Sequence, residues 1–113
     1  HGTIEDFVGT EPDQRFDIIY CSEVVEHVSD ANSFTKSLSK ALVSGGYLYL
    51  TTPNIRHWRR PRDLHSWDGY CPPSHCLYFD PKTIIKLLNK HQLKVVMSYL
   101  ALKPGIKVLA QKN

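Results

Sequence analysis

The stretch Phe16-Asp17-Ile18-Ile19-Tyr20-Cys21, followed at once by Ser22-Glu23-Val24-Val25-Glu26-His27, decides the fold. Residues 16–21 form a short apolar run with β-branched and aromatic side chains, which predicts a buried β-strand over 17–21. In open parallel α/β sheets, ligands bind just beyond the carboxyl ends of the strands. The acidic residues that follow this strand therefore lie where a functional site is expected.

Glu23, Glu26 and His27 have the spacing that places side chains on one face of a helix, if this segment is a helical turn. His75, in Pro72-Pro73-Ser74-His75, could close the cluster from a distant loop. Two oxygen ligands and two nitrogen ligands suit a divalent metal such as Mg, Mn or Zn. The alternative is a solvated helix face without a metal, which is the commoner role of such a turn.

The next two elements are a helix and a second strand. The helix is predicted from about Asp30, which can cap it, to Val43, and Gly45-Gly46 is expected to stop it. Its apolar face is formed by residues at helical spacing, namely Phe34, Leu38, Ala41 and Leu42. A strand is predicted over 47–52, before Pro53-Asn54. Residues 1–15 are expected to be a connecting segment.

The second half begins with a long irregular stretch, 55–78, which we expect to be a loop on the substrate side. Asp80 and Pro81 then predict the start of a helix, followed by strands over 93–102 and 106–111, joined at Lys103-Pro104-Gly105 as an antiparallel hairpin. The element order β-α-β-loop-α-β-β predicts an α/β fold with a mostly parallel sheet and an antiparallel last strand.

Composition limits the class of protein. The chain of 113 residues fits one domain. It has no apolar run long enough for a membrane span and no secretory signal pattern. Three cysteines, Cys21, Cys71 and Cys76, favour a reduced, cytoplasmic setting. A net charge of +3 is too small to imply nucleic-acid binding by itself.

Two segments carry the resemblance to a known family: 16–28, with its acidic turn, and Leu42-Val43-Ser44-Gly45-Gly46-Tyr47-Leu48-Tyr49-Leu50-Thr51-Thr52-Pro53-Asn54. They resemble the second half of a class I S-adenosylmethionine-dependent methyltransferase. Within that superfamily, together with 72–79, they resemble the branch with the ubiquinone-biosynthesis O-methyltransferases and the small-RNA 2′-O-methyltransferases. The resemblance covers nearly the whole chain and implies S-adenosylmethionine-dependent methyl transfer, with an oxygen of a small molecule or RNA as the expected acceptor.

The resemblance also implies functional residues. Contacts to the cofactor are implied for Ile4, Cys21 and Ser22, of which Ser22 matches the position that contacts the methionine part. A metal site is implied for Glu23, Glu26, His27 and His75. A divalent metal such as Mg held there would bind acceptor oxygens and lower the pKa of a hydroxyl. Alternatively, His27 or His75 would accept the proton directly as the catalytic base.

The family's Gly-rich cofactor loop has no counterpart in this sequence. By resemblance, residues 1–113 are then a single partial domain with strands four to seven of a seven-stranded sheet. Strand 17–21 is expected to be an exposed edge that invites pairing with another chain. A truncated chain, a homodimer through that edge and half of a split enzyme stay open. So does a catalytically inactive module that binds a partner.

Three further features have two interpretations each. Four arginines with Trp58 and Trp67 favour contact with RNA phosphates and bases, or else an ordinary surface loop anchored by its tryptophans. Cys71 and Cys76 could bind zinc with a histidine, although their spacing matches no common zinc pattern. Asn54 could touch the substrate or only stabilise a turn.

Overall fold

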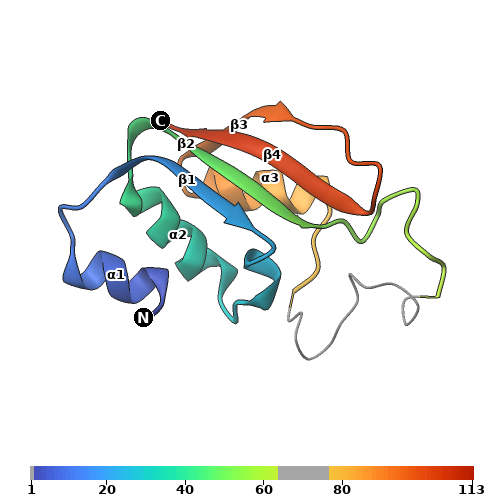
Figure 1. Ribbon diagram of the computed structural model, residues 1–113, viewed down its shortest axis with the longest axis horizontal. Coiled ribbons are helices and arrows are strands. Elements are labelled where there is room, and N and C mark those ends of the chain that lie inside the picture. Colours follow the sequence, from blue (N-terminus) through green and yellow to red (C-terminus); the bar gives the residue numbers. More distant parts are fainter. Residues whose placement is uncertain (1, 64–76) are drawn as a thin grey trace.

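The computed structural model describes residues 2–63 and 77–113. Within them, helices pack against a four-stranded sheet (Figure 1). In chain order, the elements are α1 (Ile4–Thr10), β1 (Phe16–Ser22), the 3₁₀ turn η1 (Val25–His27), α2 (Ala31–Ala41), β2 (Leu42–Pro53), α3 (Pro81–Lys90), β3 (Leu93–Ser98) and β4 (Gly105–Lys112).

The sheet has the strand order β1-β2-β4-β3. β1 and β2 are parallel, whereas β4 is antiparallel to both of its neighbours, β2 and β3. β1, β2 and β3 therefore run in one direction and β4 in the other. This arrangement confirms the predicted α/β class, the mostly parallel sheet, the antiparallel last strand and the hairpin of the last two strands.

Residues 4–10 are a helix, not the connecting segment that was predicted. Thr3 and Asp6 form a capping box, in which the Thr3 hydroxyl accepts a hydrogen bond from the Asp6 N–H at 3.1 Å. The Asp6 carboxylate in turn accepts one from the Thr3 N–H at 3.3 Å. Two backbone donors are thus satisfied at the helix start, and a helix as short as α1 was missed because it is too short to show a clear apolar period.

The boundary between α2 and β2 differs from the prediction. α2 ends at Ala41, and β2 begins at Leu42 rather than at residue 47. Gly45 and Gly46 lie inside the strand and do not stop the helix. Gly45 has a φ of +80°, and a Cβ on Gly46 would lie 2.9 Å from the Val43 carbonyl oxygen and 3.0 Å from that of Asp17. The two glycines therefore allow a tight backbone path where β2 joins β1.

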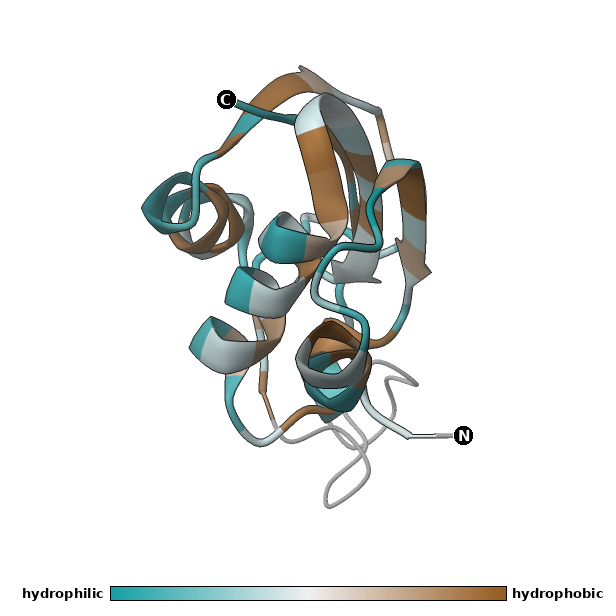
Figure 2. Ribbon diagram, turned by 90° about the vertical axis from the view of Figure 1, so that its left-hand side faces the viewer, coloured by the Kyte–Doolittle hydropathy of each residue, from teal (hydrophilic) through white to brown (hydrophobic). Residues whose placement is uncertain are grey.

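The helices α2 and α3 cover one face of the sheet, and the core lies between these helices and the sheet (Figure 2). Leu48, Leu50, Val108 and Ala110 point into this core from the two central strands. The core also contains buried residues of both helices, namely Phe34, Leu38, Ile84 and Leu88. These residues include the apolar positions expected for the predicted helices.

The prediction that strand 17–21 is buried is wrong. β1 is an edge strand, and its residues Ile18 and Tyr20 are 68% and 70% exposed. Only one sheet face is covered by helices, so alternate side chains of β1 point to the open face. There the ring of Tyr20 stacks on that of Tyr49, with centroids 5.3 Å apart. The expectation of an exposed sheet edge is confirmed.

The described parts of the stretch 55–78 contain turns but no helix or strand, as expected for an irregular loop. Its ends are held together, because Asn54 and Phe79 form an isolated bridge and the Ile55 N–H donates to the Phe79 carbonyl at 2.9 Å. Trp67, Cys71, His75 and Cys76 lie outside the described residues. Within the described ranges, no helix is long and apolar enough to cross a membrane.

Candidate functional site at the carboxyl end of the sheet

The carboxyl ends of β1 and β2 lie side by side and form the floor of the candidate site. Ser22 pairs with Thr51 in the parallel register, and their hydroxyl oxygens are 2.8 Å apart. The Glu23 N–H extends the ladder by donating to the Thr51 carbonyl at 2.9 Å. The end of this strand pair therefore carries polar side chains held in fixed positions.

The segment 23–27 is not the helical turn that was predicted. Glu23 has a φ of +55°, in the left-handed region, and the 3₁₀ turn starts only at Val25. Val25 is fully buried in the core, which fixes the direction of the turn. As a result, Glu23 is exposed and Glu26 is buried, so the two carboxylates do not share one helix face.

Glu26 is the most unusual side chain of the site, because it is a carboxylate only 1% exposed. Its Oε1 accepts a hydrogen bond from the Thr52 hydroxyl at 2.8 Å, whereas Oε2 is buried with no hydrogen bond. The Nε2 of His27 lies 3.6 Å from that oxygen, and the His27 side chain is 38% exposed. The pair thus connects the buried carboxylate to the surface.

The predicted metal ligands are brought together only in part. Among residues 2–63 and 77–113, no three His, Cys, Asp or Glu side chains form a group that could hold a metal ion. His75 lies outside the described residues, so the predicted set of four is not tested. Close to it in sequence, the Leu77 N–H donates to the Glu26 carbonyl at 3.0 Å, so the chain returns to the site at this point.

The predicted cofactor residues Cys21 and Ile4 have apolar surroundings. The Cys21 side chain is buried in the core, and its pKa is raised to about 11, first by burial and then by the charge of Glu26. It is therefore a neutral thiol at physiological pH, and only its backbone is available to a ligand. Ile4, at the start of α1, is partly buried against the core.

An open cavity of about 550 Å³ lies beside Glu23, lined also by the segment 100–105 and by Lys107. A second cavity, of about 240 Å³, is lined by Asn54, His57 and Trp58 together with residues of β4 and α3. Both border the strand ends, and the larger one has the size of a typical small-molecule site.

Asn54 and the arginine-rich stretch have local roles. The Asn54 Oδ1 accepts a hydrogen bond from the Arg56 N–H at 2.9 Å, so this residue stabilises the turn. Arg56 forms an ion pair with Asp80 at 2.9 Å. Trp58 is 71% exposed, with the Arg59 guanidinium 4.6 Å from its ring centroid, so this tryptophan is not an anchor in the core.

A family model for the methyltransferase domain matches residues 4–98. This chain belongs to the methyltransferase domain family. The mitochondrial ubiquinone biosynthesis O-methyltransferase of Dictyostelium discoideum is 42% identical over 93 residues, which cover 69% of this chain and 29% of that protein. The methyltransferase chain spans less than half the length of the curated relatives it matches.

Solved structures have the same fold as this methyltransferase chain. An O-methyltransferase family protein from Burkholderia thailandensis superposes with a TM-score of 0.73 at 12% identity, over 100% of this chain and 35% of that one. Magnesium protoporphyrin IX methyltransferase from Synechocystis PCC 6803 with bound SAH gives a TM-score of 0.66 at 14% identity, over 88% and 46% of the two chains.

Thr51 and Thr52 of this methyltransferase chain were not among the predicted site residues. Both lie in β2, in which Leu48 and Leu50 point into the core, and Thr52 is buried on the same face of the strand. A threonine at an inward position needs a hydrogen-bond partner. That requirement was the available signal for its bond to Glu26.

Proposed function

We propose that this chain is the C-terminal part of an S-adenosylmethionine-dependent methyltransferase domain that acts on an oxygen of a small molecule or RNA. The observation that carries the proposal is the family match over residues 4–98, together with a cavity and fixed polar groups at the carboxyl ends of β1 and β2. The O-methyltransferase relatives support an oxygen acceptor. The cofactor, when bound, supplies a methyl group on a positively charged sulfur.

The strand ends fit a role in holding part of that cofactor. The Ser22 hydroxyl is fixed by Thr51, and the neighbouring Glu23 lines the larger cavity. Ser22 would therefore contact the cofactor through its hydroxyl, whereas Cys21 would do so through its backbone because its thiol is buried and protonated. Ile4 would add an apolar contact. Aligning acceptor and methyl group is the main task of such a site.

For the acid–histidine cluster, we propose metal binding by Glu23, Glu26, His27 and His75. The buried Glu26 Oε2 has no hydrogen bond, as expected of an oxygen kept for a cation. Leu77 bonds to Glu26, and His75 is only two residues from Leu77, a covalent reach of roughly 7 Å. A divalent metal such as Mg would act here as a Lewis acid on the acceptor oxygen.

The second role for the same cluster is direct proton transfer by His27. Its partly exposed ring can meet an acceptor, and the Glu26 carboxylate beside it would stabilise the charge that it gains. A histidine nitrogen that binds a metal cannot also accept a proton. The two roles therefore exclude each other for one nitrogen, and metal binding distinguishes them.

The metal role is tested by titrating the chain with Mn²⁺ in a calorimeter. Glu26→Gln keeps an oxygen for the Thr52 hydroxyl but removes the charge, and it should weaken Mn²⁺ binding by about tenfold or more. Glu11→Gln, an exposed position after α1, is the matched control and should bind like the unchanged chain. Equal Mn²⁺ affinity in all three proteins would remove the metal role.

Methyl transfer itself is tested in the polypeptide that carries this chain, with labelled S-adenosylmethionine and phenolic or RNA acceptors. His27→Gln should lower the rate by about 10²-fold or more. His91→Gln, at the other end of the sheet, is the control and should retain the rate. Full activity of His27→Gln would exclude both roles of this histidine.

A catalytically inactive module that binds a partner is the second candidate, and the open edge of β1 favours it. Pairing of two copies through residues 17–21 would cover Ile18 and Tyr20, which are exposed here. Ile18→Lys should then convert a dimer to a monomer in light scattering, whereas Lys94→Gln should not. A monomer at every concentration would exclude the homodimer.

The proposed location of the protein is the cytoplasm.

A further inference from the structure

A third cavity, of about 250 Å³, lies at the opposite end of the sheet from the proposed methyl-transfer site. It is lined by Lys36 and Lys40 of α2, Lys90 at the end of α3, the following His91, and Lys112 at the end of β4. β4 is antiparallel to β2, so Lys112 lies near the beginning of β2 and far from its carboxyl end. The proposed methyl transfer does not use this cavity.

The charge around this cavity is of one sign. Among the described residues that line it, four are lysines and none is acidic. None of these lysines forms an ion pair within the described ranges. Because no carboxylate neutralises this group, it is a ready site for an external anion.

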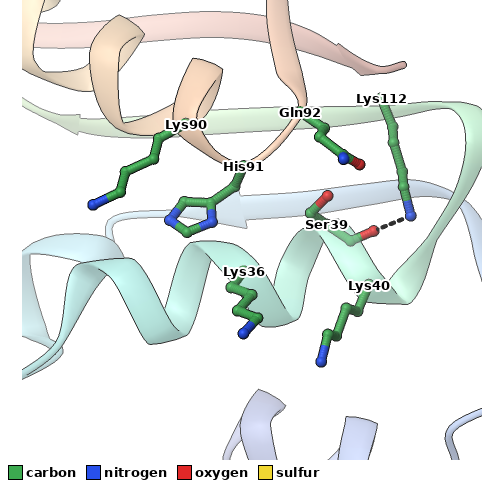
Figure 3. Close-up of a pocket in the computed structure, with 7 residues that line it drawn as sticks. All are labelled: Lys36, Ser39, Lys40, Lys90, His91, Gln92 and Lys112. Atoms are coloured by element: carbon green, nitrogen blue, oxygen red, sulfur yellow. Dashed lines mark hydrogen bonds between the residues drawn. The ribbon is translucent and has the colours of Figure 1, made fainter.

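One of the lysines has a structural role, which separates it from the rest. The Lys112 Nζ donates to the Ser39 carbonyl at 2.6 Å (Figure 3). It also donates to the Leu42 carbonyl at 2.9 Å. It thereby satisfies carbonyls at the C-terminal end of α2. Within the described ranges, the ammonium groups of Lys36, Lys40 and Lys90 form no hydrogen bond of this kind, so they can turn to a ligand.

His91 lies in the middle of the cluster, between Lys90 and Lys36 (Figure 3). One ring nitrogen, Nε2, is 3.1 Å from Asn32 Oδ1, which fixes the ring and leaves Nδ1 for another partner. The pKa of His91 is lowered by burial and then by the charges of Lys90 and Lys36. The cations are thus close enough to repel one another.

We infer that this cavity binds a compact, multiply charged phosphate anion between Lys36, Lys90 and His91. Phosphate oxygens accept hydrogen bonds from the ammonium groups of Lys36 and Lys90, and the negative charge of the phosphate relieves the repulsion among the cations and favours the protonated form of His91, whose Nδ1 can then donate as well. The volume equals roughly eight water-sized spaces, enough for a pyrophosphate group. A free phosphate in solution and the phosphate of a lipid headgroup offer the same oxygens, and the test below distinguishes the two sources.

The test is a calorimetric titration of the full chain with pyrophosphate at low salt. The double variant Lys36→Gln and Lys90→Gln should weaken binding by about tenfold or more. The matched control is Lys82→Gln with Lys94→Gln, which removes the same charge at exposed positions outside the cavity. Circular dichroism checks that both double variants keep the fold.

A parallel titration uses phosphatidylcholine vesicles with and without phosphatidic acid. Pyrophosphate binding that is lost only in the cavity variant supports a free phosphate ligand. Binding only to the phosphatidic acid vesicles, lost again only in the cavity variant, supports a headgroup. No binding by either probe, or equal loss in both double variants, would overturn the inference. A result in either direction leaves the methyltransferase proposal untouched, because the two sites lie at opposite ends of the sheet.

Discussion

Glu26 is a carboxylate buried in the core and held by a hydrogen bond from Thr52. Thr52→Val removes the hydrogen bond to Oε1 and leaves a buried carboxylate without a hydrogen-bond partner. We expect the free energy of unfolding to fall by about 1–3 kcal/mol. Urea denaturation measures this loss, and Thr52→Ser, which keeps the hydroxyl, should recover most of it. A Thr52→Val variant as stable as the unchanged chain would contradict a stabilising role for the hydrogen bond.

Cys21 gives a second prediction at the scale of one residue. Because burial and Glu26 raise its pKa from 9.0 to about 11, its reactive thiolate is about a hundredfold scarcer than that of an ordinary cysteine. Iodoacetamide at about pH 8 should therefore modify Cys21 only after unfolding in urea. Mass spectrometry of the peptide that contains Cys21 reads out the result. Rapid modification of the folded chain would contradict its burial.

His91 gives a prediction about pH. Its pKa is lowered from 6.5 in the folded chain, so the unfolded chain takes up the proton more readily. The contribution of His91 to stability is therefore complete above about pH 6.5 and is lost as pH falls through and below that value. Urea midpoints at neutral and mildly acidic pH should differ less in His91→Gln than in the unchanged chain. An identical pH dependence would contradict the assignment.

At the scale of residues, the sequence indicated which side chains belong to the candidate site, but it did not indicate their backbone conformation or their burial. Glu23, Glu26 and His27 were predicted because they directly follow a strand of a parallel sheet, where ligands bind, and because their spacing suits a shared helix face. It could not show that Glu23 adopts a left-handed conformation, or that burial of Val25 turns Glu26 inward. Those outcomes depend on packing against residues far away in the chain.

Among the elements, the junction of α2 and β2 carries the sharpest prediction. Gly46→Ala would place a Cβ against two backbone carbonyls, which cannot move without disturbing the pairing of β1 and β2. We expect a loss of about 1–3 kcal/mol in the free energy of unfolding. Gly9→Ala, in α1 with open space around it, is the control and should be neutral or slightly stabilising. Equal effects of the two changes would contradict the close packing at Gly46.

The elements were predictable where local chemistry dictates them. Asp80 and Pro81 begin α3 as expected, because the Asp80 carboxylate accepts a hydrogen bond from the Thr83 N–H at 2.8 Å. α2 and β3 were predicted to extend beyond the residues at which they end, Ala41 and Ser98, because apolar residues continue after both. The exposure of β1 was missed because an apolar strand looks the same whether its faces are covered or open.

For the whole molecule, the directions of the strands were predictable from the order of elements. A helix between two neighbouring strands of one sheet requires a crossover, which makes those strands parallel. The strand order was a different matter, because β4 inserts between β2 and β3 and no local signal specifies this. The family resemblance supplied the function, which the fold alone does not imply. The proposed roles of most site residues are thus inferred from the family resemblance, and they are supported by cavities and polar groups at one end of the sheet.

The most direct test of the central claim is a titration of the isotopically labelled chain with S-adenosylhomocysteine, followed by amide chemical shifts. We expect weak, saturable shifts at millimolar concentrations, concentrated at Cys21, Ser22, Glu23 and Thr51, with no change near Lys90 and Lys112. Shifts confined to residues away from the carboxyl ends of β1 and β2, or no saturable shift anywhere, would contradict a cofactor site at this end of the sheet.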